Sequence, residues 1–296
     1  MTVRENVANG FRIVLDGHRR SSLLSRIGFY VATALTLLFS LYPFYVMFIT
    51  SISTNESLYS RDRGVIPKSF TLEHYEVIFG SGSFPVQTYF WNSLSVALVT
   101  SVIALVVSIL GAYSFTRLDY PGGTLIRRGI IVVYMLAAIT LVIPLFQLLV
   151  RFDLVDTKTS LYITYTVKTL PLTLYILWNY FRSIPVEIEE AAFIDGYSRL
   201  ETIARVIVPV SLPVLVAAFL FSFKIAWNEY LFASVFLQSE ALYTLPIGIE
   251  TLDSAFQNVW GEIMAASIIT TLPIIVMFLY LEKYMVEGLT AGAVEG

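Results

Sequence analysis

Four consecutive residues in an apolar stretch carry the side chains best suited to contact a polar solute. They are Trp227, Asn228, Glu229 and Tyr230. An indole and a phenol offer flat apolar faces, whereas an amide and a carboxylate offer hydrogen-bonding atoms. Small-molecule sites combine these features, with a mostly apolar wall and a few polar groups that orient the ligand. The sequence therefore predicts a solute-contacting surface at residues 227–230.

Three ionisable side chains interrupt otherwise apolar segments, namely Lys168, Lys224 and Glu229. Because placing such a group inside a membrane costs about 2.5–3.5 kcal/mol or more, it often marks a functional site. Two structural alternatives are open. The Lys168 ammonium could extend to the nearer membrane interface, and Lys224 and Glu229, which are five residues apart in the sequence, could neutralise each other.

The residue types that support catalysis or metal binding are scarce. The chain has no cysteine and only two histidines, which argues against thiolate, zinc and haem chemistry. It also lacks the GxxxxGK[ST] phosphate-binding loop, so we expect no ATPase activity, no catalytic residue and no metal site in this chain. The net charge of −3 gives no basic excess that would suit nucleic acid.

The composition places the chain in a membrane. Hydrophobic residues make up 56% of it, charged residues 14%, and the mean hydropathy is +0.73. Soluble domains carry roughly 25% charged residues, so a soluble fold could not hide this much apolar surface. Since a helix satisfies its own backbone hydrogen bonds in lipid, we expect an all-α membrane protein.

Six segments are long and apolar enough, at about 20 residues each, to be predicted as transmembrane helices. The fourth contains Lys168 and Pro171, and the fifth contains Lys224 and Glu229, whereas the others are uninterrupted by charge. The predicted spans cover residues 27–50, 93–115, 129–150, 160–181, 210–232 and 265–281. Together they form one domain, 27–283, flanked by tails at 1–26 and 284–296.

The distribution of Lys and Arg predicts the orientation, because basic residues are retained on the cytoplasmic side. Most of them fall in the amino-terminal tail and in alternate loops, whereas the loop at residues 238–264 contains none. Both tails and the loop at 182–209 are therefore expected in the cytoplasm. The first apolar segment is too long for a signal-peptide core and follows a 26-residue tail, so we interpret it as a span.

The loop at residues 182–209 has the punctuation of a helix, a turn and a second helix. Pro185 suits the first turn of a helix, and Gly196 suits the left-handed residue that ends it. Ser198 and Glu201 have the spacing of a capping box, which begins the second helix. Pro209 is expected to stop that segment.

This hairpin has features of a docking element. Ala191 and Ala192 would allow close approach of another backbone, and Glu189, Glu190 and Asp195 would offer anionic contacts beside them. An ordinary amphipathic hairpin lying at the membrane interface remains the alternative at this point.

Several motifs resemble one known family. Glu190-Ala191-Ala192, with Gly196 four residues later and then Ile207-Val208-Pro209, resembles the EAA loop of the permeases of binding-protein-dependent ABC importers. The chain is similar in particular to the maltose-type sugar permeases. The segments that carry this similarity are Asn92-Ser93, residues 112–117 (AYSFTR), Tyr120-Pro121-Gly122, Trp227-Asn228-Glu229 and residues 288–293 (GLTAGA).

The resemblance implies a fold, partners and site residues. It implies six transmembrane helices with a coupling helix between the fourth and fifth, in the prokaryotic inner membrane. Implied partners are a second homologous permease, two ATP-binding subunits that hold ATP and Mg²⁺, and an extracytoplasmic sugar-binding protein. The residues implied to couple to the ATPase are Glu190, Ala191, Ala192, Asp195 and Gly196, and residues 227–230 would line the translocation path.

Other functions remain as alternatives. A permease for a non-sugar solute would have the same loop. A secondary transporter would normally need more spans, internal repeats and a relay of carboxylates, whereas this chain has a single carboxylate within a span, Glu229. A membrane scaffold without transport activity is the third alternative.

Overall fold

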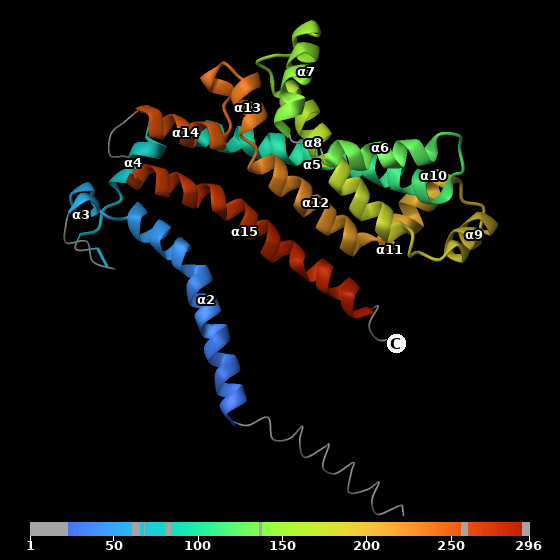
Figure 1. Cartoon of the computed structure of the whole chain (residues 1–296), viewed down its shortest axis with the longest axis horizontal. Coiled ribbons are helices and arrows are strands. Elements are labelled where there is room, and N and C mark those ends of the chain that lie inside the picture. The colour runs from blue at the N-terminus through green and yellow to red at the C-terminus, as the bar shows by residue number, and fades with distance from the viewer. Residues whose placement is uncertain are drawn as a thin grey trace, which may run out of the picture.

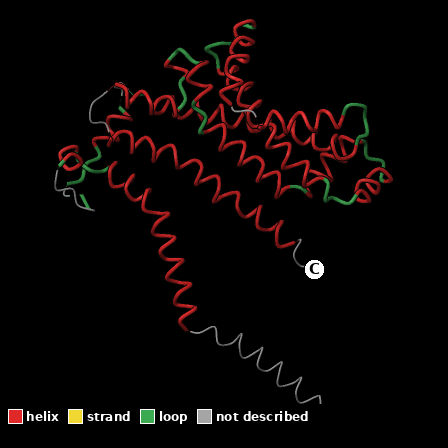
Figure 2. Tube along the Cα trace, viewed as in Figure 1, coloured by secondary structure: helices red, strands yellow, loops and turns green. Residues whose placement is uncertain are grey.

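The computed structural model describes residues 23–60, 66–67, 69–80, 84–135, 138–255 and 260–291. Their regular structure is helical (Figure 2), and the backbone pairing found among them is an isolated bridge between Ser53 and Phe70. This confirms the predicted all-α fold. Residues 1–22 of the predicted amino-terminal tail and residues 292–296 of the predicted carboxy-terminal tail lie outside the described residues.

Four long helices, α5, α8, α12 and α15, pack side by side as the body of the molecule (Figure 1). The helix α2 contacts α15 near its carboxyl end, and its amino-terminal part extends away from this bundle. The buried core lies between α5, α8 and α12, where Ala97, Leu161, Leu177 and Ala218 are fully buried. The longer helices are α2 (Leu23–Ser51), α5 (Val86–Arg117), α6 (Gly123–Met135), α7 (Ala138–Arg151), α8 (Lys158–Phe181), α12 (Leu212–Trp227) and α15 (Trp260–Ala291).

Short helices occupy the two ends of this bundle. At one end lie α9, α10 and a π-helical turn that leads into α11, and at the other lie α3, α4 and α14 (Figure 1). Their bounds are α3 (Asn55–Tyr59), α4 (Glu73–Phe79), α9 (Val186–Ile194), α10 (Arg199–Thr202), the π-helix Ile203–Ile207, α11 (Val208–Val210), α13 (Leu231–Phe236), a 3-10 turn at Glu240–Leu242 and α14 (Leu245–Ala255).

Among the described helices, three are long and apolar enough to cross a membrane, namely α2, α5 and α15. Two bent pairs raise the number to five if each pair is a single span. The helix α8 overlaps the fourth predicted span and is 24 residues long, but it is not among the helices that meet the apolar criterion. The count of six spans therefore stays a prediction.

The sequence of α8 is polar because this helix faces protein. Leu161, Tyr165 and Leu177 are buried against neighbouring helices, so α8 needs less apolar surface than a helix facing lipid. Its buried threonine hydroxyls are satisfied within the helix: Thr164 Oγ1 donates to the Ser160 carbonyl at 2.8 Å and Thr173 Oγ1 to the Thr169 carbonyl at 2.9 Å.

Two of the predicted spans are not single straight helices, which corrects the sequence-based bounds. The segment 129–150 belongs to α6 and α7, which are bent by 107° relative to each other. The segment 210–232 contains α12, which meets the preceding helix at 86° and ends at Trp227. Pro213 has no N–H to donate to the carbonyl of residue 209, so one helical hydrogen bond is missing at this bend. Pro209 does not end the helix at its own position, because it lies inside α11.

The last helix is longer than predicted at both ends. We expected residues 265–281, whereas α15 covers Trp260–Ala291 and so includes the first part of the predicted tail 284–296. The loop predicted at 238–264 also contains regular structure, since α14 packs on the amino-terminal half of α5. At Gly248 an added Cβ would lie 2.3 Å from the ring of Tyr89, so only glycine permits this close approach.

Asp156 ties the loop between α7 and α8 to the segment after α13. One of its carboxylate oxygens accepts hydrogen bonds from the Gln238 and Ser239 amides at 2.8 and 2.9 Å, and the other accepts one from the Ser239 hydroxyl. These bonds favour the charged form and lower the pKa of the Asp156 carboxyl. The contribution to stability is therefore present above the ordinary carboxyl pKa and is lost as the pH falls below it.

Replacing Asp156 with asparagine should make unfolding less dependent on pH in the acidic range. Asparagine tolerates the positive φ of 58° at this position and keeps one acceptor oxygen, but it has no proton to gain. Thermal unfolding in detergent at pH 7 and at about pH 2.5, which lies below the ordinary carboxyl pKa, would measure this. The matched control is Asp153→Asn, at a φ of 54°, which should keep the wild-type fall in melting temperature. An unchanged fall in Asp156→Asn would contradict the assignment.

Candidate functional site

The helix–turn–helix predicted in the 182–209 loop is present, and the turn at Gly196 and the capping box at Ser198 are confirmed, whereas Pro185 precedes the first residue of α9 as its N-cap. The helix α9 ends at Ile194, and Gly196 adopts a φ of +88°, the left-handed conformation that glycine accepts most readily. The Tyr197 amide then donates to the Ala192 carbonyl at 3.0 Å, closing the end of the helix. The capping box is also formed, because the Glu201 amide and the Ser198 amide each bond the other residue's side chain.

Four of the five predicted coupling residues are exposed. Glu190, Ala191, Asp195 and Gly196 are accessible, whereas Ala192 is only 4% exposed. Ala192 therefore packs inside the chain and is not available for close approach by another backbone. Its small side chain fits the packing of α9 against α10 and the π-helix Ile203–Ile207.

Glu189 does not belong to the exposed acidic group, which corrects the prediction of anionic contacts at 189, 190 and 195. Its side chain is 3% exposed and forms an ion pair with Arg117 at the end of α5, with a 2.5 Å distance between Nε and Oε1. Arg117 also donates to the Ile184 carbonyl at 2.8 Å. The guanidinium thus holds both the beginning of α9 and the segment that leads into it.

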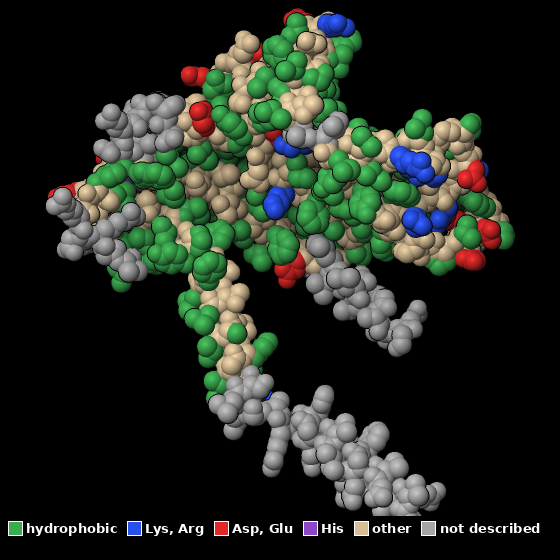
Figure 3. Space-filling model, in the orientation of Figure 1, with side chains coloured by type: hydrophobic (Ala, Val, Ile, Leu, Met, Phe, Trp, Pro, Cys, Tyr) green, Lys and Arg blue, Asp and Glu red, His purple; other side chains and the backbone are tan. Residues whose placement is uncertain are grey.

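The outer surface of this hairpin carries both exposed apolar side chains and charged side chains. Ile194 is 86% exposed and Leu200 is 69% exposed, next to the half-exposed Val186 and Phe193. Basic and acidic side chains gather at the same end of the molecule, around α9 and α10, whereas the flanks of the bundle are largely apolar (Figure 3). An exposed apolar patch with a polar rim is typical of a protein-binding surface.

The four residues 227–230 do not form one continuous surface. Trp227 is 1% exposed, and its indole N–H donates to the Thr270 carbonyl at 3.0 Å, so this side chain belongs to the core. Glu229 is 2% exposed. Asn228 and Tyr230 are exposed and can reach a solute in this arrangement. A role of these residues in a translocation path stays a prediction.

Glu229 pairs with Lys168 on α8, across 61 residues of sequence, at a distance of 2.9 Å. The other Glu229 oxygen accepts the amides of Phe232 and Ala233, which start α13. The alternative in which Lys224 and Glu229 neutralise each other is therefore wrong, because the Lys168 ammonium is the partner of the Glu229 carboxylate. The ion pair instead joins α8 to the break between α12 and α13.

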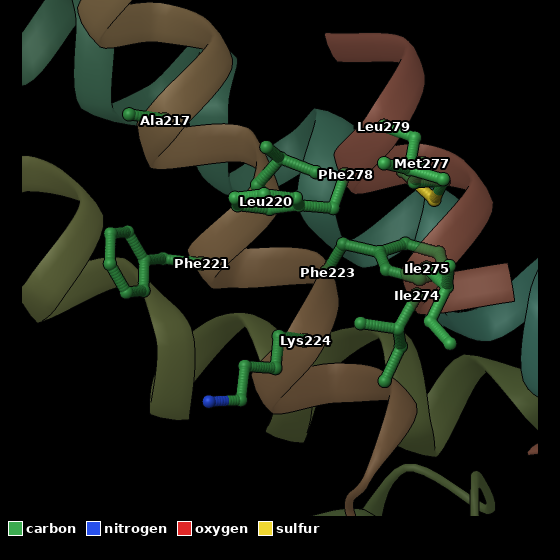
Figure 4. A pocket seen from close by; sticks show the side chains of 10 residues that line it. All are labelled: Ala217, Leu220, Phe221, Phe223, Lys224, Ile274, Ile275, Met277, Phe278 and Leu279. Atoms are coloured by element: carbon green, nitrogen blue, oxygen red, sulfur yellow. The ribbon is translucent and has the colours of Figure 1, made fainter. Parts of the chain in front are cut away.

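Lys224 is exposed on α12 and lies at one end of an apolar groove between α12 and α15. Figure 4 shows its ammonium pointing away from the α15 side chains. The groove has a volume of about 410 Å³ and is otherwise lined by apolar residues, among them Leu220, Phe223, Ile274 and Phe278. No ion pair of Lys224 is found among the described residues.

Several of these features were not predicted from the sequence. The partner of Glu189 and the partner of Lys168 are distant in sequence, so no local pattern could indicate them. One signal was available: Glu189 and Ala192 are three residues apart and share a helix face, which separates them from Glu190 and Ala191.

Within the described ranges, no cluster of three or more potential metal ligands is found.

The chain is similar to a known protein family and to several of its members. Residues 104–290 match the family described as binding-protein-dependent transport system inner membrane component. The chain is 44% identical over 273 residues to the inner membrane ABC transporter permease protein YcjP of Escherichia coli (strain K12), covering 92% of this chain and 98% of that protein. It is 34% identical over 278 residues to the trehalose/maltose transport system permease protein MalG of Thermococcus litoralis, covering 94% and 99%.

Among solved structures, the fold is similar to that of a bacterial ABC transporter involved in the import of the acidic polysaccharide alginate. The TM-score is 0.77 at 22% sequence identity, and the match covers 90% of this chain and 98% of that chain. This likeness shows that the two chains share a fold.

Proposed function

Because the chain belongs to the family of binding-protein-dependent transport system inner membrane components, we propose that it forms half of the translocation pathway of an ATP-driven sugar importer. A relative that is 34% identical over nearly its whole length is a trehalose/maltose transport system permease, which favours a sugar over other solutes. A permease for a non-sugar solute is the second candidate, because the match to the family does not depend on the solute.

The observation that carries this proposal is the hairpin of α9 and α10. It lies at one end of the bundle (Figure 1), is held there by the buried Arg117–Glu189 pair, and exposes Ile194 beside Glu190 and Asp195. We assign Glu190, Ala191, Asp195 and Gly196 to the contact with an ATP-binding subunit. Ala192 contributes by keeping α9 close to its own chain.

Coupling requires that the partner favours one arrangement of the permease over another. Shifting a two-state equilibrium from 1:99 to 99:1 takes about 5.5 kcal/mol of differential binding. A rigidly held hairpin can transmit such a bias, since movement of α9 must carry Arg117 and hence the end of α5 with it. ATP and Mg²⁺ are placed on the two partner ATPase subunits, and this chain supplies no catalytic residue.

The remaining partners follow from the same proposal. They are a second homologous permease, which completes the pathway, and an extracytoplasmic binding protein, which delivers the sugar. The charge asymmetry of the sequence supports an orientation with the α9 end and both termini in the cytoplasm and α14 outside. Asn228 and Tyr230, being exposed, are the members of the 227–230 group that we place on the path.

Replacing Ile194 with aspartate should weaken the attachment of the ATPase. Burying an isoleucine contributes about 1.5–3 kcal/mol, and an unpaired charge in its place adds a desolvation cost. The loss corresponds to roughly tenfold or more in affinity. Copurification of the ATP-binding subunits with the tagged chain, and ATP-dependent uptake in cells, would both fall.

The matched control is Ile66→Asp, because Ile66 is 69% exposed in the segment between α3 and α4, which lies at the opposite end of the bundle from α9. It should retain partner recovery and uptake. Full recovery of the ATPase with Ile194→Asp would refute the docking surface. Uptake that persists without the ATPase and requires an ion gradient would instead point to a secondary transporter, and copurification without any uptake would point to a scaffold.

A further inference from the structure

A recess at the α14 end of the molecule is not explained by the coupling hairpin or by the core. Its volume is about 390 Å³, within the range of about 300–1,000 Å³ that is usual for small-molecule pockets. It lies between the link that joins α12 to α13, one face of α14, and the beginning of α15. Its lining residues are Tyr230, Pro246, Ile249, Glu250, Trp260 and Ile263.

The helix α14 presents a fixed face to this recess. Pro246, Ile249 and Glu250 have the spacing of one helix face, and Leu245 and Leu252, which adjoin that face at Ile249, are 0% and 4% exposed and so pack into the protein. The Asn92 amide donates to two carbonyls of the preceding segment, at Ala241 and Tyr243, both at 2.9 Å. The wall of the recess is therefore anchored to α5 and does not depend on a bound ligand for its position.

The chemistry of the recess suits a sugar ring. Trp260 is 55% exposed and Tyr230 is 41% exposed, so two large aromatic faces are accessible in one concavity. Aromatic rings pack against the apolar C–H face of a pyranose, and the exposed carboxylate of Glu250 can accept hydrogen bonds from hydroxyl groups. Aromatic residues also collect at membrane interfaces, but an interfacial belt requires neither a concavity nor a carboxylate beside the rings.

The charge around the recess discriminates among sugars. None of its lining residues is basic, and the one charged residue among them is Glu250, whose side chain is exposed. A sugar acid brought to this surface would meet a like charge, which opposes binding. A neutral sugar meets an acceptor that its hydroxyl groups can satisfy.

We propose that this recess is an outer binding subsite for the ring of an uncharged sugar, which stacks on Trp260 and Tyr230 and donates hydroxyl protons to Glu250. The inference rests on the proposed importer function and adds to it the class of solute and two further contact residues, Glu250 and Trp260. The recess lies at the end of the bundle opposite α9 (Figure 1), where a solute released outside would arrive first.

The test is ATP-dependent uptake by the complete transporter in cells, with radiolabelled trehalose, maltose, diacetylchitobiose and a mannuronate disaccharide as probes. Wild type should take up at least one neutral probe and not the mannuronate. For that neutral probe, Trp260→Ala and Tyr230→Ala should each raise KM by roughly three- to tenfold, as expected for the loss of about 0.5–1.5 kcal/mol of aromatic contact. Vmax should stay within about twofold of wild type, because the coupling hairpin is untouched.

Two further variants separate a contact from a structural role. Trp260→Phe keeps an aromatic face and should restore most of the affinity, and Glu250→Gln should raise KM for the neutral probe. The matched control is Trp91→Ala, since Trp91 is 64% exposed on α5 but does not line the recess. Uptake with an unchanged KM in Trp260→Ala and Tyr230→Ala, or uptake of the mannuronate alone, would overturn the subsite while leaving the importer in place. No uptake of any probe by wild type would reject the sugar importer itself.

Discussion

Replacing Glu189 with glutamine should lower the stability of the chain by about 3 kcal/mol, the lower end of the 3–5 kcal/mol found when one partner of a buried ion pair is removed. The cause is that Arg117, 15% exposed, would keep its charge without a counter-charge. Arg117 would keep its hydrogen bond to the Ile184 carbonyl, but its charged contact with α9 would be lost, which weakens the attachment of α9 to the end of α5. ATP-dependent uptake should therefore fall by roughly tenfold or more, the factor that 1.4 kcal/mol of lost coupling produces.

Thermal unfolding in detergent and uptake in cells would measure the two effects. The matched control is Glu187→Gln, because Glu187 is exposed in the first turn of the same helix and should change stability by less than about 0.5 kcal/mol. The double variant Arg117→Met with Glu189→Met removes both charges and should recover much of the stability. Purely additive effects of the two single substitutions would show that the side chains are not coupled.

Replacing Lys168 with methionine should be the second most damaging change, with a loss of about 2–4 kcal/mol in stability. Glu229 would then hold a charge at 1% exposure without its cation. The loss is expected to be smaller than for a fully isolated charge, because the Phe232 and Ala233 amides still donate to the carboxylate at 3.0 and 3.3 Å.

The comparison with Lys224→Met makes this prediction specific. Lys224 lies on α12, closer in sequence to Glu229, but it is exposed and forms no ion pair with the described residues. Its substitution should leave the melting temperature nearly unchanged. If Lys224→Met were the more damaging of the two, the pairing between α8 and the α12–α13 break would be wrong.

The two ion pairs hold different segments of the proposed permease together. The Arg117–Glu189 pair fastens the coupling hairpin to the end of α5, whereas the Lys168–Glu229 pair fastens the break between α12 and α13 to α8. Both link segments that are far apart in sequence, with separations of 72 and 61 residues. Rigid connections of this kind are what a two-state movement needs, since packed elements shift as units.

Sequence reasoning succeeded where the controlling interactions are local. The apolar runs located α2, α5 and α8 within a few residues, except that α5 starts at Val86 and not at Ser93. The capping box at Ser198 and the left-handed Gly196 were also predicted, because such motifs depend on residues three or four positions apart. The importer role of the hairpin came from resemblance to a family, and membership of that family is now established.

The tertiary structure alone decided which way the charged side chains face. Glu189 and Glu190 are adjacent and chemically alike, yet one is buried against Arg117 and the other is exposed, because a helix turns about 100° per residue and only packing selects the inner face. The same holds for Glu229, whose partner proved to be Lys168 rather than the nearer Lys224. The sequence by itself determined a helical membrane chain with a compact hairpin. Which residues of that hairpin are free to bind, and which aromatic groups share an outer recess, follows from contacts between segments that no local spacing encodes.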